Sequence, residues 1–218
     1  MSIMELTEEI RLVRLRHSRR FSYVKVLNKP NGWYCAGVGN SAAVFRHDRY
    51  PDIAIKIFSD ICTHIALRES EVYRKLGDSS FYPKLYGSGK NYLVLRYIPG
   101  QSAYECLLEG MFIQEQVVSD INEAVSYARQ RGLNPRNLHA KNILVYNGRG
   151  YLVDVSDYMK NGRCYHFDIL RYIYYKLYIR FSRPGMRIPF WLLESIRRGY
   201  RLTASFLKML KIKKSETE

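Results

Sequence analysis

The chain has 218 residues, of which 47% are hydrophobic and 14% aromatic, and its formal net charge is +15 at pH 7. This composition excludes a disordered chain and is sufficient for one folded core, or for two lobes around a cleft. The excess of positive charge favours an acidic partner, which is nucleotide phosphate, nucleic acid or an anionic membrane surface.

The first half of the sequence is predicted to be rich in strands. Residues 5–17 are expected to form a short charged helix, and residues 64–76 a second helix that ends at Gly77. Apolar residues that recur with a period of two between turn residues predict the strands. These strands span residues 21–27, 33–36, 42–47, 53–58, 84–86 and 92–97. The segment 98–101, Ile-Pro-Gly-Gln, is the best candidate for a linker.

After this linker the sequence becomes mainly helical. A helix is predicted at 114–131, followed by a loop at 133–142 that is rich in Pro and Asn. Two short strands, 143–146 and 151–155, surround the turn at Asn147-Gly148. Helices are expected from about residue 167, with a break at 183–185. A strand-rich half therefore meets a helix-rich half across a short linker, which predicts an α+β chain.

A glycine-rich turn and a lysine in an apolar strand follow one another in the first half. In the segment 37–44, Gly-Val-Gly-Asn-Ser-Ala-Ala-Val, the glycines allow backbone N–H groups to approach phosphate oxygens, although an ordinary β-turn has the same composition. Lys56 lies in Ile-Ala-Ile-Lys-Ile-Phe, where an inward lysine needs an anionic partner. The alternative is a lysine on the solvent face of an amphipathic strand. Glu69 follows on the next predicted helix.

The second predicted hairpin brings two oxygen ligands together. Asn142 precedes the strand 143–146, and Asp154 lies at the end of the strand 151–155. An amide oxygen and a carboxylate at neighbouring strand ends suit Mg²⁺, which prefers hard oxygen ligands that it shares with phosphates. The alternative is a hydrophilic hairpin mouth without a ligand.

In this order and spacing, the segments resemble the protein-kinase-like superfamily, in particular small bacterial serine/threonine-kinase-like proteins. The resemblance covers about residues 26–173. It implies one bilobal domain over residues 1–218. The N-lobe, about 18–97, would hold an antiparallel sheet and one helix, the hinge would span 96–101, and the C-lobe, 102–214, would be mainly helical with a basic tail.

The resemblance also implies that the chain binds ATP with Mg²⁺. Lys56, oriented by Glu69, would hold the α- and β-phosphates, while Asn142 and Asp154 would hold Mg²⁺. The backbones of Arg96 and Ile98, in the hinge, would bond the adenine. The residues implied to contact the nucleotide are Gly37, Val38, Gly39, Asn40, Val44, Ala54, Lys56, Arg96 and Ile98.

Three departures from the family pattern concern catalysis. Residues 137–142 match the spacing D-L-x-x-x-N, but Asn137 replaces the catalytic Asp, and Pro135 replaces the preceding His. Only 13 residues separate Asp154 from Asp168, the implied anchoring Asp of a C-lobe helix, which leaves no room for a full activation segment. Asn137 is expected to orient a hydroxyl, and His139 to contact the γ-phosphate or take a proton. The alternatives are a serine/threonine-protein-kinase-like phosphotransferase, a pseudokinase that binds nucleotide, and an atypical small-molecule, sugar or lipid kinase.

The basic end of the chain suggests a further partner besides ATP and a protein or small-molecule phosphoacceptor. Between Arg171 and Lys214 there are 12 Lys and Arg residues against one acid, Glu194. The segment 207–214 is the best candidate to bind an anionic membrane or nucleic acid. The aromatic residues of 172–191 are expected to pack mainly in the C-lobe core, with the cations on a solvated face. The four cysteines are not spaced as a redox pair or a zinc site, and no apolar run reaches the roughly 20 residues of a membrane-spanning helix. We therefore expect a cytoplasmic protein, peripheral at most to the membrane.

Overall fold

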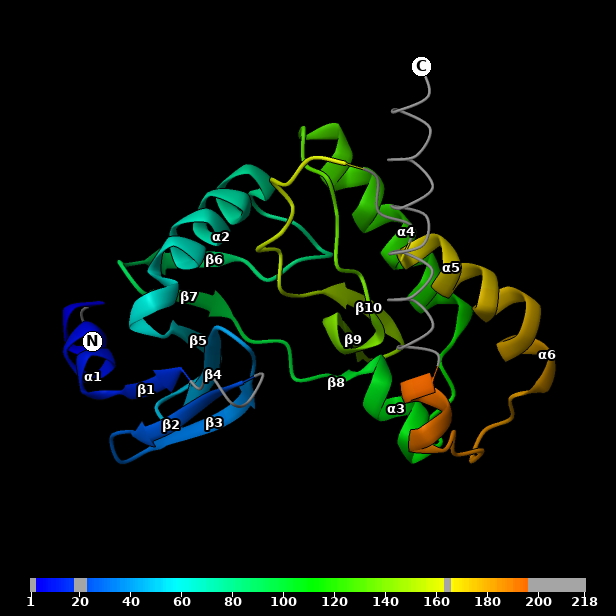
Figure 1. Cartoon of the computed structure of the whole chain (residues 1–218), viewed down its shortest axis with the longest axis horizontal. Coiled ribbons are helices and arrows are strands. Elements are labelled where there is room, and N and C mark those ends of the chain that lie inside the picture. The colour runs from blue at the N-terminus through cyan, green and yellow to red at the C-terminus, as the bar shows by residue number, and fades with distance from the viewer. Residues whose placement is uncertain (1–2, 18–22, 163–165, 196–218) are drawn as a thin grey trace, which may run out of the picture.

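Strands and helices separate along the chain into two lobes, as the computed structural model in Figure 1 shows. The structure describes residues 3–17, 23–162 and 166–195. The strand-rich lobe contains α1 (Ile3–Leu12), β1 (Arg14–His17), β2 (Val24–Asn28), β3 (Trp33–Val38), β4 (Ala42–His47), β5 (Tyr50–Phe58), η1 (Asp60–Cys62), α2 (Thr63–Leu76), β6 (Leu85–Ser88) and β7 (Tyr92–Arg96). The helical lobe contains β8 (Gln101–Ser102), α3 (Ala103–Glu109), α4 (Glu115–Gln130), η2 (Ala140–Asn142), β9 (Ile143–Tyr146), β10 (Arg149–Leu152), α5 (His166–Ile173), the π-helical turn η3 (Tyr174–Tyr178) and α6 (Ile179–Phe181).

The five-stranded sheet of the first lobe has two differently covered faces. Its strands run in the order β3-β4-β5-β7-β6, and every neighbouring pair is antiparallel. Side chains alternate along each strand, so Phe45 and Ile55 join a core with Ile10 of α1. Phe58 and Leu93 belong to the other core, which contains residues of α2 and of the helical lobe. The predicted α+β class is confirmed.

The predicted helix over residues 5–17 is wrong in its second half. The helix ends at Leu12, and residues 14–17 form β1, which pairs with β2. Val13 is 8% exposed, and Leu15 packs against the same core. An alternation of apolar and basic residues places both side chains on one face of a strand, whereas a helix would turn them apart. The strand predicted at 21–27 is found at Val24–Asn28, and residues 18–22 lie outside the described ranges.

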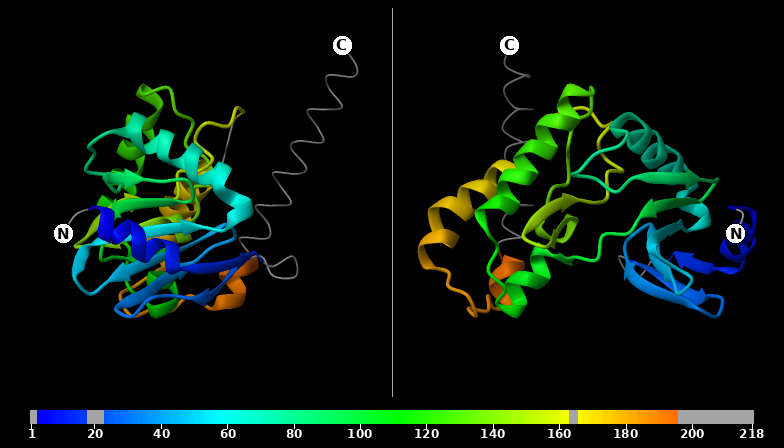
Figure 2. Two further views of the ribbon diagram at one scale, coloured as in Figure 1. Left: turned by 90° about the vertical axis from the view of Figure 1, so that its left-hand side faces the viewer. Right: turned by 180° about the vertical axis from the view of Figure 1, so that it is seen from behind.

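The linker between the lobes leads directly into the second sheet. Residues 101–102 form β8, which pairs with β9, and β9 pairs with β10. The Ser102 hydroxyl accepts a hydrogen bond from the backbone N–H of Glu105. In return, the backbone N–H of Ser102 donates to the Glu105 carboxylate, and this capping box starts α3. The linker crosses between the lobes in Figure 1 and in the right-hand view of Figure 2. It therefore fixes the position of the three-stranded sheet relative to the five-stranded one.

The helices after residue 166 only partly confirm the prediction of an aromatic core. Tyr174 is 8% exposed and stacks on Tyr178 at a centroid distance of 5.4 Å, so these two rings belong to the core. Other aromatic side chains of this region are exposed, which corrects the prediction for them. They are Tyr172, Tyr175, Phe181, Phe190 and Trp191. These elements bury only part of their surface, because Tyr174 packs in the core while the neighbouring side chains of Tyr172 and Tyr175 stay exposed.

The basic segment 207–214 lies outside the described residues, so its predicted role stays a prediction. Among the described helices, none has both the length and the apolar character that crossing a membrane requires.

Candidate active site

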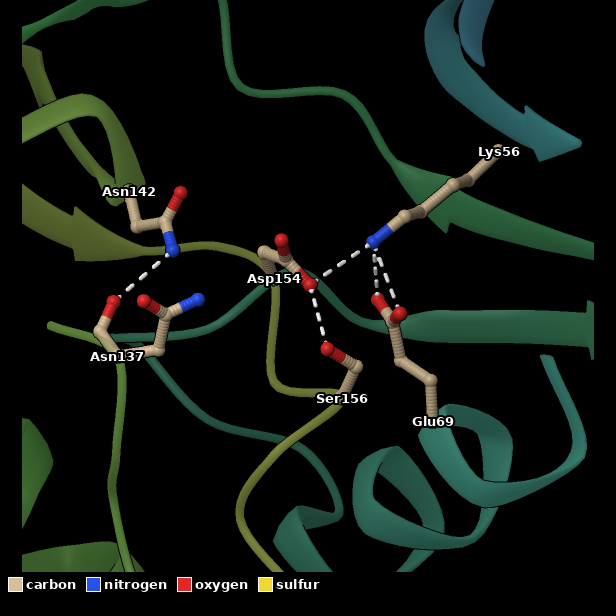
Figure 3. Close-up of polar contacts among 6 residues, drawn as sticks. All are labelled: Lys56, Glu69, Asn137, Asn142, Asp154 and Ser156. Atoms are coloured by element: carbon tan, nitrogen blue, oxygen red, sulfur yellow. Dashed lines mark hydrogen bonds and ion pairs between the residues drawn. The ribbon is translucent and has the colours of Figure 1, made fainter. Parts of the chain in front are cut away.

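Lys56 of β5 and Glu69 of α2 form a buried ion pair between the sheet and its helix (Figure 3). The Lys56 ammonium donates to both carboxylate oxygens of Glu69 at 2.8 Å. The Lys56 side chain is 12% exposed, and that of Glu69 is 0% exposed. The alternative of a solvent-facing lysine is therefore wrong, because the Lys56 side chain is largely buried and its ammonium is bonded to Glu69 of α2.

The Lys56 ammonium also binds Asp154 from the helical lobe, with 3.2 Å between Nζ and Oδ1. Burial alone would lower the pKa of Lys56, but the carboxylates of Asp154 and Glu69 outweigh it and raise that pKa. The nearby Lys56 ammonium holds the pKa of Asp154 below its usual value. Burial raises the pKa of Glu69 to about 7 against the attraction of Lys56. The three groups thus form one coupled network that links the two lobes.

The raised pKa of Glu69 predicts a pH-dependent stability. Between 4.5 and about 7, the folded protein holds a proton on Glu69 that the unfolded chain has already released. The contribution of this carboxyl to the free energy of unfolding therefore decreases as the pH rises through that window. We expect urea denaturation at a series of pH values to show this decrease for the wild type relative to Glu69→Gln. The control is Glu71→Gln, which changes an exposed glutamate on the same helix; parallel curves for the wild type and Glu69→Gln would contradict the prediction.

Asn142 and Asp154 lie side by side at the mouth of the β9–β10 hairpin. The backbone N–H of Val153 donates to the Asn142 carbonyl at 3.0 Å, which sets the two side chains on neighbouring segments. The side-chain amide of Asn142 donates through Nδ2 to the Asn137 carbonyl at 3.1 Å. Ser156 donates through its hydroxyl to Asp154 Oδ1 at 3.0 Å. Figure 3 shows the contacts of Asn142 with Asn137 and of Asp154 with Ser156 and Lys56.

Both loops that carry this site contain backbone in the left-handed region. Asn137 has a φ of 58° and Asp154 a φ of 61°. Asn and Asp adopt this region more easily than other non-glycine residues, yet it still costs free energy. Such strain gathers at functional sites, where the surrounding structure holds it. The third such residue, Asn147, lies in the predicted turn of the hairpin and requires no functional explanation.

The oxygen groups at the mouth of the β9–β10 hairpin suit Mg²⁺ that is also bound by phosphate and water, and not a metal ion bound by protein side chains alone. Within the described ranges, no three His, Cys, Asp or Glu side chains gather closely enough to hold a metal ion. Mg²⁺ is commonly bound by one or two carboxylates together with phosphates and water. Because Asn142 uses its nitrogen for the Asn137 carbonyl, its amide oxygen remains as a ligand beside the Asp154 carboxylate. The residues present therefore fit Mg²⁺ that is shared with a nucleotide.

The predicted glycine-rich segment is the hairpin between β3 and β4. Its turn is closed by the Gly39 N–H, which donates to the Ala42 carbonyl at 2.8 Å. A Cβ atom on Gly37 would meet no atom within 4 Å, so the backbone there borders open space. Val44 pairs with Lys56, and Ala54 lies two residues before Lys56 on the same face of β5. Open space beside this backbone fits the approach of phosphate oxygens.

The end of β7 and the residues after it are the predicted hinge. The Arg96 N–H donates to the Lys84 carbonyl at 2.8 Å. The next N–H, of Tyr97, donates to the Asp52 carbonyl at 2.7 Å. Ile98 is 6% exposed and follows directly. The predicted contacts of Arg96 and Ile98 with an adenine stay a prediction.

The structure adds a tether that the sequence motifs did not predict. Asn134 donates through its side-chain amide to the carbonyls of Lys160 and Gly162, each at 2.8 Å. Arg136 donates to the carbonyls of Asn161 and Gly162. These bonds hold the loop of Asn137 against the segment that follows Asp154. No spacing rule finds them, because the acceptors are backbone carbonyls about 25 residues later in the chain.

Asp168, predicted as an anchor, lies on α5 with its carboxylate 3.8 Å from the Arg171 guanidinium, and its side chain is 51% exposed.

His139 lies near enough to Asp154 to contribute to lowering the pKa of that carboxyl. The structure therefore joins Lys56, Glu69 and Asp154 through ion pairs, and Asn142 is bonded to Asn137 on the neighbouring loop.

Comparison with known proteins identifies a relative along most of the chain. The chain is 34% identical over 179 residues to the Bacillus subtilis (strain 168) protein named "Putative serine/threonine-protein kinase YrzF". The match covers 81% of this chain and 82% of that relative. No protein-family model matches the chain.

Two solved structures overlap with part of the chain. The crystal structure of the Mycobacterium tuberculosis PknI kinase domain shares 20% identity over 58% of this chain and 60% of its own, with a TM-score of 0.44. The structure of the CAK complex from Chaetomium thermophilum, bound to ATP-gamma-S, shares 19% identity over 57% of this chain and 46% of the matched chain, with a TM-score of 0.47.

Proposed function

Because this chain belongs to the protein-kinase-like superfamily, we propose that it is a phosphotransferase that uses ATP with Mg²⁺ at the site between its lobes. The observation that carries this proposal is the contact of Lys56 with both Glu69 and Asp154. It brings a phosphate-binding cation from one lobe to a metal-binding carboxylate of the other. Phosphoryl transfer depends mainly on such positioning and on charge neutralisation.

Each residue of the network has a distinct part in the proposed reaction. Lys56 binds the α- and β-phosphates, and Glu69 holds the ammonium in place for them. Asn142 and Asp154 hold Mg²⁺ through oxygen atoms. When bound, Mg²⁺ neutralises charge on the phosphates. The glycine-rich hairpin covers the phosphates, and the Arg96 carbonyl and the Ile98 N–H bind the adenine.

Whether the chain is an active enzyme or a pseudokinase depends on what Asn137 can do in the catalytic loop. Its amide cannot take a proton, but its oxygen can accept a hydrogen bond from the acceptor hydroxyl and orient it. His139, close to Asp154, is the neighbouring group that can take the proton. We favour an active enzyme over a pseudokinase because the ion pair and the metal carboxylate are already assembled. A serine/threonine side chain and a small-molecule hydroxyl are both candidate acceptors.

The direct test is binding and turnover of ATP by the full chain. We expect Mg²⁺-ATP to raise the melting temperature, because a ligand that binds the folded state stabilises it by mass action. ATP labelled in the γ-phosphate should also release its label to an acceptor. The control is ATP with a chelator in place of Mg²⁺. No shift in the melting temperature at millimolar ATP would contradict the proposed function.

The proposal also concerns where the protein is located in the cell. Cys35, Cys62 and Cys106 are free thiols, which favours the cytoplasm. Tyr172 is 63% exposed, Phe181 69% and Trp191 67%. Aromatic side chains among the cations of this region favour a peripheral contact with an anionic surface.

A further inference from the structure

A cavity of about 390 Å³ begins at the catalytic loop and continues into the helical lobe. Its polar lining residues include Asn40, from the tip of the glycine-rich hairpin, and Asn137, His139 and Lys141. Among the described residues, neither Lys56 nor Asp154 lines it. The cavity therefore includes Asn137 and His139, the residues proposed to orient and deprotonate the acceptor hydroxyl, and borders the glycine-rich hairpin through Asn40. That is where an acceptor hydroxyl must arrive.

The inner wall of this cavity is apolar. Val118 of α4, Leu170 and Ile173 of α5, and Leu107 of α3 line it with other apolar side chains. Pockets that bind small molecules have volumes of about 300–1,000 Å³ and apolar walls with few polar groups, and this cavity fits that description. A sugar or another wholly polar acceptor would leave its hydroxyl groups without partners against such a wall.

The charges at the cavity are of one sign. Lys141 and Arg171 line it, and among the described lining residues there is no Asp or Glu. The Lys141 ammonium lies 4.4 Å from the centre of the Tyr104 ring, and this contact holds the ammonium beside another lining residue of the cavity. Arg171 donates to the Asn122 side chain at 3.3 Å and lies 3.8 Å from Asp168, which is outside the lining. The cavity therefore complements an apolar chain joined to a negative group.

We propose, resting on the proposed transfer from ATP, that this cavity binds the phosphoacceptor and that the acceptor is an anionic membrane lipid with a free hydroxyl. The apolar chain lies between α3, α4 and α5, and the negative headgroup lies near Lys141 and Arg171. The hydroxyl reaches Asn137 and His139. A peptide fits less well, because the segment between Asp154 and Asp168 has only 13 residues and offers little surface for an extended chain.

The proposed reaction transfers the γ-phosphate of ATP to the lipid hydroxyl. The lipid hydroxyl oxygen forms a bond to the γ-phosphorus, and the bond from that phosphorus to the β,γ-bridging oxygen breaks. The electron pair of the broken bond leaves with ADP. The hydroxyl proton passes to a ring nitrogen of His139, which releases it to water. Asn137 accepts the hydrogen bond that orients the hydroxyl before transfer.

The test uses the full chain and lyso-phosphatidylglycerol, which has one apolar chain, one phosphate and free hydroxyls, below its micelle concentration. Isothermal titration calorimetry without nucleotide should detect binding. Val118→Phe fills the cavity and should weaken binding at least roughly tenfold, since one misplaced methylene in an apolar pocket already costs about that much. Arg171→Glu reverses an exposed charge without disturbing the core and should weaken binding roughly fivefold. With γ-labelled ATP, label should enter this lipid, and Val118→Phe should lose that label.

The matched controls are Leu177→Phe, at a side chain that is 53% exposed, and Lys75→Glu, on α2 in the other lobe. Both should bind the lipid as the wild type does. The inference is overturned if Val118→Phe and Arg171→Glu both bind at wild-type affinity, if zwitterionic lyso-phosphatidylcholine binds equally tightly, or if label enters casein and Val118→Phe keeps that activity. Those results would leave the proposed function intact if Mg²⁺-ATP still raises the melting temperature. Absence of that ATP effect, by contrast, would count against the proposed function itself.

Discussion

Replacing Asn137 by Asp should raise the rate of phosphoryl transfer by about 10²-fold. General-base help is typically worth about 10²–10⁴-fold, and positioned phosphoryl transfer needs less of it than most reactions, so we expect the low end. Asp tolerates the left-handed backbone that Asn137 adopts, with its φ of 58°. The hydrogen bond from Asn142 goes to the backbone carbonyl of residue 137, so the substitution keeps it. The affinity for ATP should barely change.

The measurement compares transfer of γ-labelled phosphate by the wild type, Asn137→Asp and His139→Gln. If Asn137→Asp lowers an existing activity, then Asn137 acts as an amide that orients the hydroxyl. His139→Gln should abolish turnover, because His139 takes the hydroxyl proton in the wild type. If both the wild type and Asn137→Asp are inert while ATP still binds, the chain is a pseudokinase. One common robust rate for all three proteins would contradict the assignment of the catalytic loop.

Replacing Asp154 by Ala should abolish the Mg²⁺-dependent part of the stabilisation by ATP. At an ATP concentration of one hundred times Kd, the wild type should gain about 2.7 kcal/mol in its free energy of unfolding. The variant lacks the carboxylate of the proposed metal site, while Lys56 keeps its two bonds to Glu69. ATP should still bind weakly without metal. The measurement is thermal denaturation with ATP, in Mg²⁺ and in chelator.

Two further variants separate the metal site from general damage. Asp154→Asn keeps a residue that tolerates the φ of 61° and removes only the charge, so it should also lose the Mg²⁺-dependent gain. Asp157→Asn changes a nearby carboxylate that pairs with Lys160 at 2.6 Å, and it should retain the full gain. Equal loss in Asp154→Asn and Asp157→Asn would show that the effect is unspecific charge removal, against the assignment of Asp154.

The local sequence pattern was sufficient to predict most of the secondary structure and the order in which the candidate site residues follow one another along the chain. The period of two predicted the strands around Lys56, and the period of 3.6 predicted the helix of Glu69. The turn at Asn147-Gly148 and the strand before it were also found from the sequence. One exception is β1, where burial of Val13 and Leu15 against the sheet decided against a longer helix. A short charged segment has little preference of its own, so packing determines its form. Another exception is the strand predicted at 151–155, which is found at Arg149–Leu152, so that Asp154 lies after its end.

The sequence by itself determined which residues are candidates for the chemistry, because their types and spacing are local properties. Only the tertiary structure decided how they meet. Lys56 and Asp154 are 98 residues apart in the chain, and no local period reports a contact at that separation. The same holds for the complete burial of Glu69, which raises its pKa, for the backbone tether at 160–162, and for the apolar cavity beside His139. Each depends on two lobes and several helices packing together, and such packing is a sum over distant contacts that sequence spacing does not contain.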